Sequence, residues 1–183
     1  VSETLGLLYA DHFPYRQFAS ARGVRRSPIH SQLEAEGACF GEASGWERAN
    51  WFLPKAAKNA GKKAEYDYSW RRQNWFEYSA AEHMAVRQKV GMFDMSSFGK
   101  IKLIGRDAEA VLQRIAANDV AVPVGKIVYT QFLNSEGHIE ADVTITRLSA
   151  DEFLIVTPAA TIRRDLHWIN GHIPDSSHAI AVD

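Results

Sequence analysis

The stretch that decides the fold runs from Lys126 to Leu148: KIVYTQFL (126–133), NSEG (134–137) and HIEADVTITRL (138–148). In the last of these segments the apolar residues Ile139, Ala141, Val143 and Ile145 alternate with polar ones. That alternation is typical of a strand with one face in a core. The four residues between the segments include Gly137, which tolerates the positive φ of a tight turn. The sequence therefore predicts an antiparallel β-hairpin.

Further strands and helices are predicted on both sides of this hairpin. Residues 107–117 place apolar side chains on one helical face, and residues 79–90 carry Ser79 and Glu82 at the spacing of a capping box. We expect helices at 79–90, 107–117 and 160–169 and strands at 100–104, 153–157 and 179–183. The last strand should end without a partner. The predicted fold class is α+β, an antiparallel sheet flanked by helices.

The segment before residue 75 has little periodicity, and we interpret residues 1–74 as a loop-rich linker or arm. A short helical turn is expected at 31–37, and the glycines at 37, 41 and 45 indicate loop. Residues 55–72 hold six Lys or Arg. We interpret them as a solvated arm in preference to a basic groove for an anionic ligand. The tryptophans of this segment should pin it to a core.

Composition excludes several classes of protein. The net charge is −1 over 183 residues, so no broad field attracts nucleic acid or an anionic membrane. No apolar run approaches the ~20 residues of a membrane span. The single cysteine, Cys39, forbids an internal disulfide and fits a reducing compartment. We expect a cytoplasmic protein, or a matrix protein in a mitochondrion. The first residue is Val and the last strand is unfinished, so we also expect a fragment.

Asp142 is the residue of the hairpin that most needs an explanation, since Asp is disfavoured inside strands. Glu140, Asp142, Thr144 and Thr146 should share the face opposite the core. Asp142 could simply be solvated there. Alternatively, its carboxylate lines a ligand pocket, where it could accept a hydrogen bond and a proton from an amine.

Two aromatic residues are further candidates. Tyr129 could stack on a flat heterocycle or could be a cross-strand packing residue, and Phe98 could line a ligand site. The seven histidines show no metal-ligand spacing, and Cys39 has no evident base partner. No dinucleotide-binding glycine motif follows a strand, so no flavin or nicotinamide site is expected in this chain.

The hairpin and its surroundings resemble the glycine-cleavage T-protein (aminomethyltransferase) family. The resemblance is carried by VGMFDMS (90–96), GKIVYT (125–130), LNSEG (133–137) and DVT (142–144). RRSPIH (25–30), GACFGE (37–42) and GWERANWF (45–52) are similar to the junction in sarcosine and dimethylglycine dehydrogenases. In those proteins a flavin-binding oxidase domain precedes a folate-binding domain. By this resemblance, residues 75–183 are the first half of a T-protein-like folate-binding domain, and 1–74 follow the flavin domain.

The resemblance implies roles for six residues. Asp142 is the acid beside the reactive amines of tetrahydrofolate, and Tyr129 matches the pterin-pocket tyrosine. Phe98, Thr144, Val156 and Thr157 are the remaining expected folate contacts. Two positions depart from the family: Ala141 replaces the first acid of an Asp-Asp pair, and Pro158 stands where aminomethyltransferases have an Asn. The second departure favours the dehydrogenase branch.

The function implied is capture of a one-carbon unit from N-methyl amine oxidation as methylenetetrahydrofolate. Tetrahydrofolate is the expected cofactor, and FAD is expected only in a parent domain outside this chain. The expected partners are that flavin oxidoreductase domain and the C-terminal half of the family fold, with a homo-oligomer as a further option. We expect the chain to be part of a transferase that is inactive alone. Two alternatives stay open, a non-catalytic folate-binding regulator and an inert structural fragment.

Overall fold

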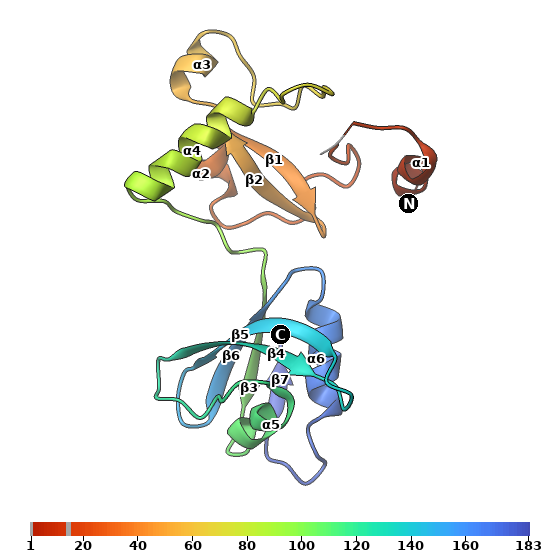
Figure 1. Ribbon diagram of the computed structural model, residues 1–183, viewed down its shortest axis with the longest axis vertical. Helices are drawn as coiled ribbons and strands as arrows, with labels where there is room; N and C mark the ends of the chain where they lie inside the picture. The colour runs from red at the N-terminus through yellow and green to blue at the C-terminus, as the bar shows by residue number, and fades with distance from the viewer. Residues whose placement is uncertain (1, 14–15) are drawn as a thin grey trace. The chain divides into compact units, whose positions relative to one another are not determined.

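The computed structural model describes residues 2–13 and 16–183, and the chain divides into two compact units between Ser97 and Phe98. Figure 1 shows the helices and strands of each unit. The sequence placed its boundary between residues 74 and 75. The structure instead joins the following helix to the N-terminal unit, because Glu82 accepts a hydrogen bond from the Phe52 amide at 2.7 Å. What the two segments are in a parent protein stays a prediction.

The N-terminal unit is built on a two-stranded antiparallel sheet. Its elements are α1 (Ser2–Tyr9), α2 (His30–Ala35), β1 (Ala38–Ala43), β2 (Trp46–Phe52), α3 (Lys55–Asn59) and α4 (Phe76–Gln88). The helical turn predicted at 31–37 is confirmed as α2. The prediction of loop through the following glycines is wrong, because β1 and β2 pair there.

Two glycines explain why that hairpin looked like loop. Ser44 and Gly45 form the tight turn that connects β1 to β2, with positive φ values of 54° and 82°. The glycine at position 45 therefore belongs to a hairpin turn between two paired strands. Gly41 lies inside β1, where a Cβ would meet the side chains of Asn50 and Gln17 at 2.1 and 2.5 Å. Position 41 therefore needs a glycine because side chains pack closely against this strand, and not because the chain is irregular there.

A small aromatic core holds the N-terminal unit together. Trp51 is 1% exposed and stacks on Tyr78 of α4, with ring centroids 5.6 Å apart. The expected pinning role of the tryptophans therefore holds for Trp51, whereas Trp70 is 73% exposed. The capping box predicted at Ser79 is not formed. Helix α4 begins at Phe76, and Glu82 bonds the β2 end instead.

The C-terminal unit is an antiparallel five-stranded sheet with two helices. Its elements are β3 (Gly99–Ile104), α5 (Ala108–Ile115), β4 (Ile127–Leu133), β5 (Ile139–Arg147), β6 (Glu152–Thr157), α6 (Ile162–Gly171) and β7 (Ile180–Val182). The strand order is β4-β5-β6-β3-β7, and every pair is antiparallel. The predicted α+β class and the hairpin at its centre are confirmed.

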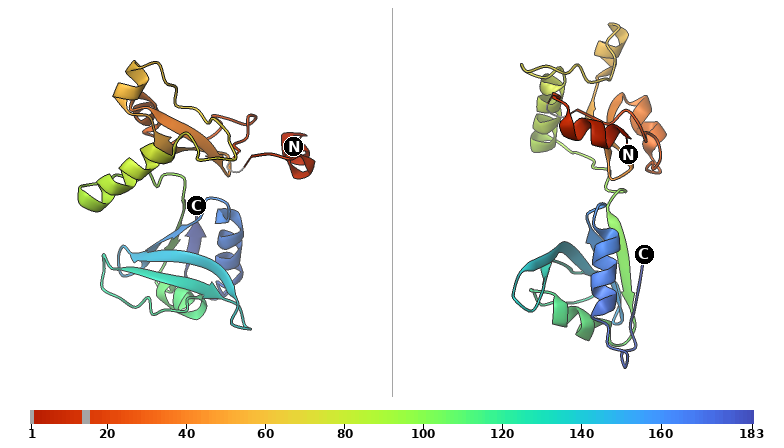
Figure 2. Two further views of the ribbon diagram at one scale, coloured as in Figure 1. Left: turned by 45° about the horizontal axis from the view of Figure 1, so that its top comes forward. Right: turned by 90° about the vertical axis from the view of Figure 1, so that its right-hand side faces the viewer.

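The last strand has a partner, which corrects the expectation that it ends unpaired. β7 runs beside β3, with Lys102 opposite Val182 and Ile104 opposite Ile180 (Figure 2). A polar contact fixes the approach to this strand, since the Asp107 carboxylate accepts a hydrogen bond from the His178 amide at 2.7 Å.

Both helices of this unit pack on one face of the sheet. They bury Val111, Leu112, Ile115 and Ile169 against inward-facing strand residues such as Phe153. Along β5, Ala141, Val143 and Ile145 face this core as predicted, while Ile139 beside the turn is 68% exposed. The opposite face of the sheet carries no helix of this unit. That open face holds the candidate site.

Candidate functional site

The candidate site centres on three side chains of the β4–β5 hairpin. Gln131 lies directly opposite Asp142, and its Nε2 donates a hydrogen bond to Oδ1 of Asp142 at 2.9 Å. Tyr129 lies diagonally across from Asp142 and also hydrogen bonds its carboxylate. Two donors on neighbouring positions of β4 therefore hold one exposed carboxylate on the open face.

The Tyr129–Asp142 contact changes the chemistry of the phenol. The hydrogen bond to the Asp142 carboxylate raises the pKa of Tyr129 above its usual value, and the negative charge of Asp142 acts in the same direction. Tyr129 therefore stays protonated and can donate. Its side chain is 62% exposed, so the ring also presents a flat surface to the solvent.

Strand register brings two more of the predicted residues beside this group. Tyr129 is opposite Thr144, and Thr144 is opposite Val156 on the next strand. The three residues form one line across β4, β5 and β6 on the open face, and Thr144 and Val156 are half-buried. Phe98 directly precedes β3 and is also half-buried. The structure thus gathers Tyr129, Asp142, Thr144 and Val156.

Thr157 lies on the other face of the sheet. It is 1% exposed, and its hydroxyl donates to the carboxylate of Asp165 on α6. Asp165, itself 1% exposed, also accepts hydrogen bonds from Thr161 at 2.6 Å and from Arg164 at 3.0 Å. The side chain of Thr157 ties β6 to α6.

Gln131 is the member of the group that the sequence did not reveal. A bulge between Phe132 and Leu133 shifts the pairing next to the turn. The turn sequence alone would have given a register one residue out, so the partner of Asp142 could not be read from it. The alternation of β5 was the only available signal that a β4 side chain would meet Asp142 on this face.

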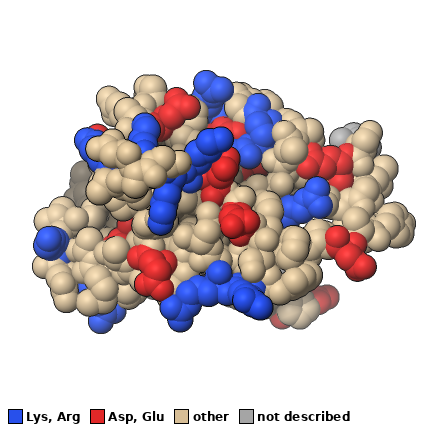
Figure 3. Space-filling model, turned by 90° about the horizontal axis from the view of Figure 1, so that it is seen from above, with Lys and Arg blue, Asp and Glu red and all other residues tan. Residues whose placement is uncertain are grey.

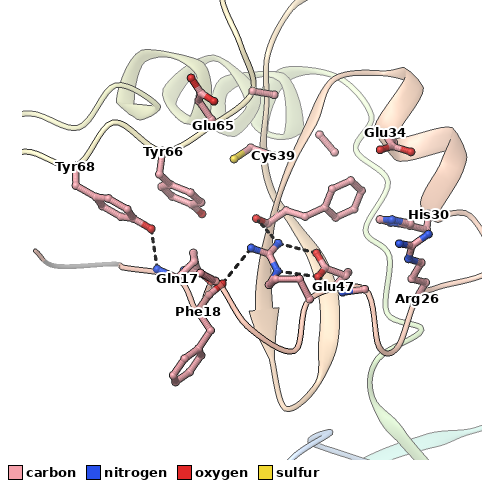
Figure 4. Close-up of a pocket in the computed structure, with 16 residues that line it drawn as sticks. Gln17, Phe18, Arg26, His30, Glu34, Cys39, Glu47, Glu65, Tyr66 and Tyr68 are labelled. Atoms are coloured by element: carbon pink, nitrogen blue, oxygen red, sulfur yellow. Dashed lines mark hydrogen bonds and ion pairs between the residues drawn. The ribbon is translucent and has the colours of Figure 1, made fainter. Parts of the chain in front are cut away.

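A separate hollow of about 630 Å³ lies in the N-terminal unit (Figure 4). Its wall contains a part-buried ion pair, in which Arg22 donates two hydrogen bonds to Glu47 at 2.8 and 2.7 Å. Glu47 also accepts from the Gly23 amide at 2.6 Å. These bonds from Arg22 and Gly23 hold the pKa of Glu47 below its usual value despite burial.

The ion pair of this wall is engaged with other groups of the protein. Arg22 also donates to the carbonyls of Phe18 and Phe40, at 3.3 and 3.0 Å. Burial raises the pKa of the Cys39 thiol to about 11, which favours the protonated form at neutral pH. The Glu47 of the GWER stretch therefore has a structural role, joining the segment around Arg22 to β2.

A second, more apolar hollow of about 610 Å³ lies in the same unit, between β2, α4 and residues 90–97. Neither hollow contains a residue of the hairpin face. The residues expected from the sequence to bind the ligand therefore lie on the open sheet face and not in either hollow.

Within residues 2–13 and 16–183, no three His, Cys, Asp or Glu side chains gather as a metal site. Lys and Arg alternate with Asp and Glu on the face shown in Figure 3. No helix in the described part of the chain has the length and apolarity to cross a membrane.

The fold and the hairpin define a class of protein, the aminomethyltransferase-type domain. A solved structure of glycine cleavage system aminomethyltransferase T from Bartonella henselae superposes with a TM-score of 0.68 at 20% identity. It covers 87% of this chain, and the match spans 38% of the solved one. The model of the GCVT N-terminal domain matches residues 29–183, and the chain belongs to this family.

Curated relatives place the chain in a particular branch. It is 49% identical over 167 residues to 4-methylaminobutanoate oxidase (formaldehyde-forming) of Paenarthrobacter nicotinovorans, covering 91% of this chain and 20% of that protein. It is 36% identical to human mitochondrial sarcosine dehydrogenase, covering 77% and 17%. The chain thus spans about a fifth of the length of these relatives. The resemblance to sarcosine dehydrogenase-type proteins is confirmed.

Proposed function

We propose that this chain supplies part of a tetrahydrofolate-binding module, which captures the one-carbon unit formed when an N-methyl amine such as sarcosine or dimethylglycine is oxidised. The product would be methylenetetrahydrofolate. The observation that carries the proposal is the Asp142 carboxylate, exposed on the open sheet face and held by Gln131 and Tyr129. Family membership supports the folate-related role.

The group suits a flat, nitrogen-rich ligand for two reasons. A carboxylate accepts N–H hydrogen bonds and can take a proton from an amine as that amine attacks carbon. The exposed ring of Tyr129 offers a stacking surface, which a heterocycle can cover. Asp142 would therefore be the proton acceptor, and Tyr129 the residue that orients the ring.

The other predicted contacts have graded roles in this proposal. Thr144 and Val156 form the floor beside Tyr129. Phe98 would border the ligand from the start of β3. Thr157, whose hydroxyl bonds Asp165 on the core side, would contribute by fixing the β6 backbone under Val156.

The oxidation step belongs to another part of the parent protein. In this proposal a flavin oxidoreductase domain with FAD generates the reactive carbon, and the remaining half of the family fold completes the folate site. The relation to human sarcosine dehydrogenase supports that arrangement, since its name describes the oxidation of an N-methyl amine.

The similarity to the Paenarthrobacter nicotinovorans oxidase favours a second candidate function, a structural role without folate. The name of the Paenarthrobacter oxidase says that its carbon leaves as formaldehyde. In that case the domain would be a structural part of the oxidase, and the group around Asp142 would not take part in transfer.

Calorimetric titration with tetrahydrofolate under anaerobic conditions separates the two candidates. We expect saturable binding, weakened about tenfold by Asp142→Asn, because a hydrogen bond to a charged group is lost. Asp175→Asn is the matched control, since Asp175 is an exposed acid in the loop after α6. Equal binding of tetrahydrofolate by the unaltered chain and by Asp142→Asn contradicts the proposal and favours the second candidate.

A further inference from the structure

The β4–β5 hairpin contains a bulged residue just before the candidate site. The pairing steps from Ala141 to Ile139 on β5 while it advances by one residue on β4, from Phe132 to Leu133. Glu140 is therefore the extra residue of β5. A bulged residue stands outside the regular ladder of the two strands, so its backbone groups need partners from elsewhere.

The bulge decides on which face of the sheet Asp142 lies. If the pairing continued from the turn without a bulge, Asp142 would lie opposite Thr130. Side chains of paired residues share a face, and Thr130 is 1% exposed on the core side. With the bulge, Asp142 lies opposite Gln131 on the open face, where the hydroxyl of Tyr129 also bonds it. The bulge is thus a condition for the candidate site.

Arg164 of α6 binds this bulge from outside the hairpin. Its Nη2 donates a hydrogen bond to the carbonyl oxygen of Glu140 at 2.6 Å, and its Nε donates to Oδ1 of Asp165 at 3.0 Å. Asp165 is 1% exposed and also accepts hydrogen bonds from Thr157 and Thr161. A guanidinium can serve two acceptors in fixed directions. Arg164 therefore connects a well-anchored buried acid to the bulged backbone.

The side chain of the bulged residue is held as well. Nδ2 of Asn134, in the turn, donates to Oε1 of Glu140 at 3.1 Å. Oδ1 of Asn134 accepts from the amides of Glu136 and His138, both at 3.0 Å. These contacts lie within the hairpin and would move with it. The bond from Arg164 comes from α6 and ties the bulge to the rest of the C-terminal unit.

We propose that Arg164 is a positioning residue for Asp142. Its bond to the Glu140 carbonyl holds the bulge, and the bulge keeps Asp142 opposite Gln131. The inference rests on the proposed function, because Arg164 acts only through the carboxylate that would accept the proton. A misplacement of about 1 Å at a reacting group is enough to weaken its action, so a backbone contact two residues away can matter.

An NMR titration of the full chain labelled at tyrosine tests this role without a ligand. Arg164→Met removes the guanidinium, so Asp142 should be less well aligned and the pKa of Tyr129 should fall towards its ordinary 10.0. Arg164→Lys keeps a charge beside Asp165 and covers the case in which Arg164→Met does not fold. A single ammonium lacks the fork that serves two acceptors, so this variant should also lower the pKa of Tyr129.

Two variants of neighbouring residues control for stability and for charge. Thr161→Val removes a bond of 2.6 Å to Asp165 but keeps the bond from Arg164 to the bulge. Arg163→Met removes a positive charge from an exposed position of α6. Neither should lower the pKa of Tyr129, since loss of a positive charge by itself raises the pKa of a phenol. An unchanged pKa of Tyr129 in the folded Arg164 variants, or an equal fall in Thr161→Val, overturns the positioning role.

Calorimetry with tetrahydrofolate separates this inference from the function on which it rests. Arg164→Met should lower the affinity about two- to tenfold. In the Asp142→Asn background it should cause no further loss, because the carboxylate that Arg164 positions is already absent. Equal losses in both backgrounds overturn the inference and leave the function standing. If the unaltered chain and Asp142→Asn bind equally, the proposed function fails, and the pKa of Tyr129 still decides the role of Arg164.

Discussion

Gln131 and Asp142 face each other across β4 and β5, and the amide of Gln131 donates to the carboxylate of Asp142 at 2.9 Å. The Tyr129 phenol bonds the same carboxylate from the diagonal position. Asp142 is therefore held by two side chains of β4 although it is exposed. A group that is oriented before its ligand arrives loses less entropy on binding than a freely rotating one.

Replacing Gln131 by Leu should loosen Asp142 without disturbing the core. The variant removes one hydrogen bond, so we expect tetrahydrofolate affinity to fall about two- to tenfold, by calorimetry. Gln113→Leu is the control, because Gln113 donates to Asp119 at 2.6 Å at the other side of the unit. Equal effects of the two variants on affinity would show that Gln131 acts through general stability and not through Asp142.

The pKa of Tyr129 provides a test that needs no ligand. Its pKa is raised above 10.0, first by the hydrogen bond to Asp142. Asp142→Asn removes the negative charge and should lower the pKa of Tyr129 towards that ordinary value. The measurement is an NMR titration of chains labelled at tyrosine, with Tyr129→Phe to assign the signal. An unchanged pKa in Asp142→Asn would mean that the two side chains do not interact in solution.

The C-terminal unit could be predicted from sequence because its signals are local. Alternating residues in β5 and the apolar stripe of α5 depend on one element each, and they were found within a few residues. The open face also followed from alternation, so Asp142 and Thr144 were correctly placed on one side. The position of Gln131 opposite Asp142 depends on the register between β4 and β5, which a bulge shifts by one residue.

The N-terminal unit was hidden for a different reason. Its strand β1 is made largely of small residues, and the pattern resembles loop because neighbouring side chains fill the space above Gly41. Its stability comes from long-range pairs such as Arg22 with Glu47 and Trp51 with Tyr78. Such long-range pairs cannot be predicted from the periodicity of a single segment.

The Arg22–Glu47 pair should make the N-terminal unit sensitive to acid. The bonds from Arg22 lower the folded-state pKa of Glu47 below its ordinary 4.5. A lowered pKa means that the stabilisation is fully present above the unfolded pKa and is lost as pH falls through the folded one. Glu47→Gln should therefore lower Tm at pH 7. The difference in Tm between this variant and the unaltered chain should disappear at low pH.

Tryptophan fluorescence can follow this unfolding, since Trp51 is buried in the same unit. Glu47→Gln should cost roughly 1–3 kcal/mol at neutral pH, because the buried carboxylate loses charge-assisted bonds. Glu36→Gln removes an exposed contact to Lys55 of 3.4 Å and should leave Tm unchanged. A difference in Tm between Glu47→Gln and the unaltered chain that stays constant from neutral to acid pH would contradict a role for the charge of Glu47.

Thr157 allows the folding and binding roles of β6 to be separated. Its buried hydroxyl donates to Asp165, so Thr157→Val removes one of the bonds that satisfy a buried carboxylate. We expect a loss of about 1–3 kcal/mol in the free energy of unfolding, measured by urea titration. Thr157→Ser keeps the hydroxyl and should recover most of that stability.

The affinity for tetrahydrofolate should stay within about twofold in both variants. Loss of a hydrogen bond between Thr157 and the ligand itself would lower the affinity by more than that. If Thr157→Val has unchanged stability but binds tetrahydrofolate much more weakly, the Thr157 hydroxyl contacts the ligand directly. The side chain of Thr157 would then have to face the ligand and not the core.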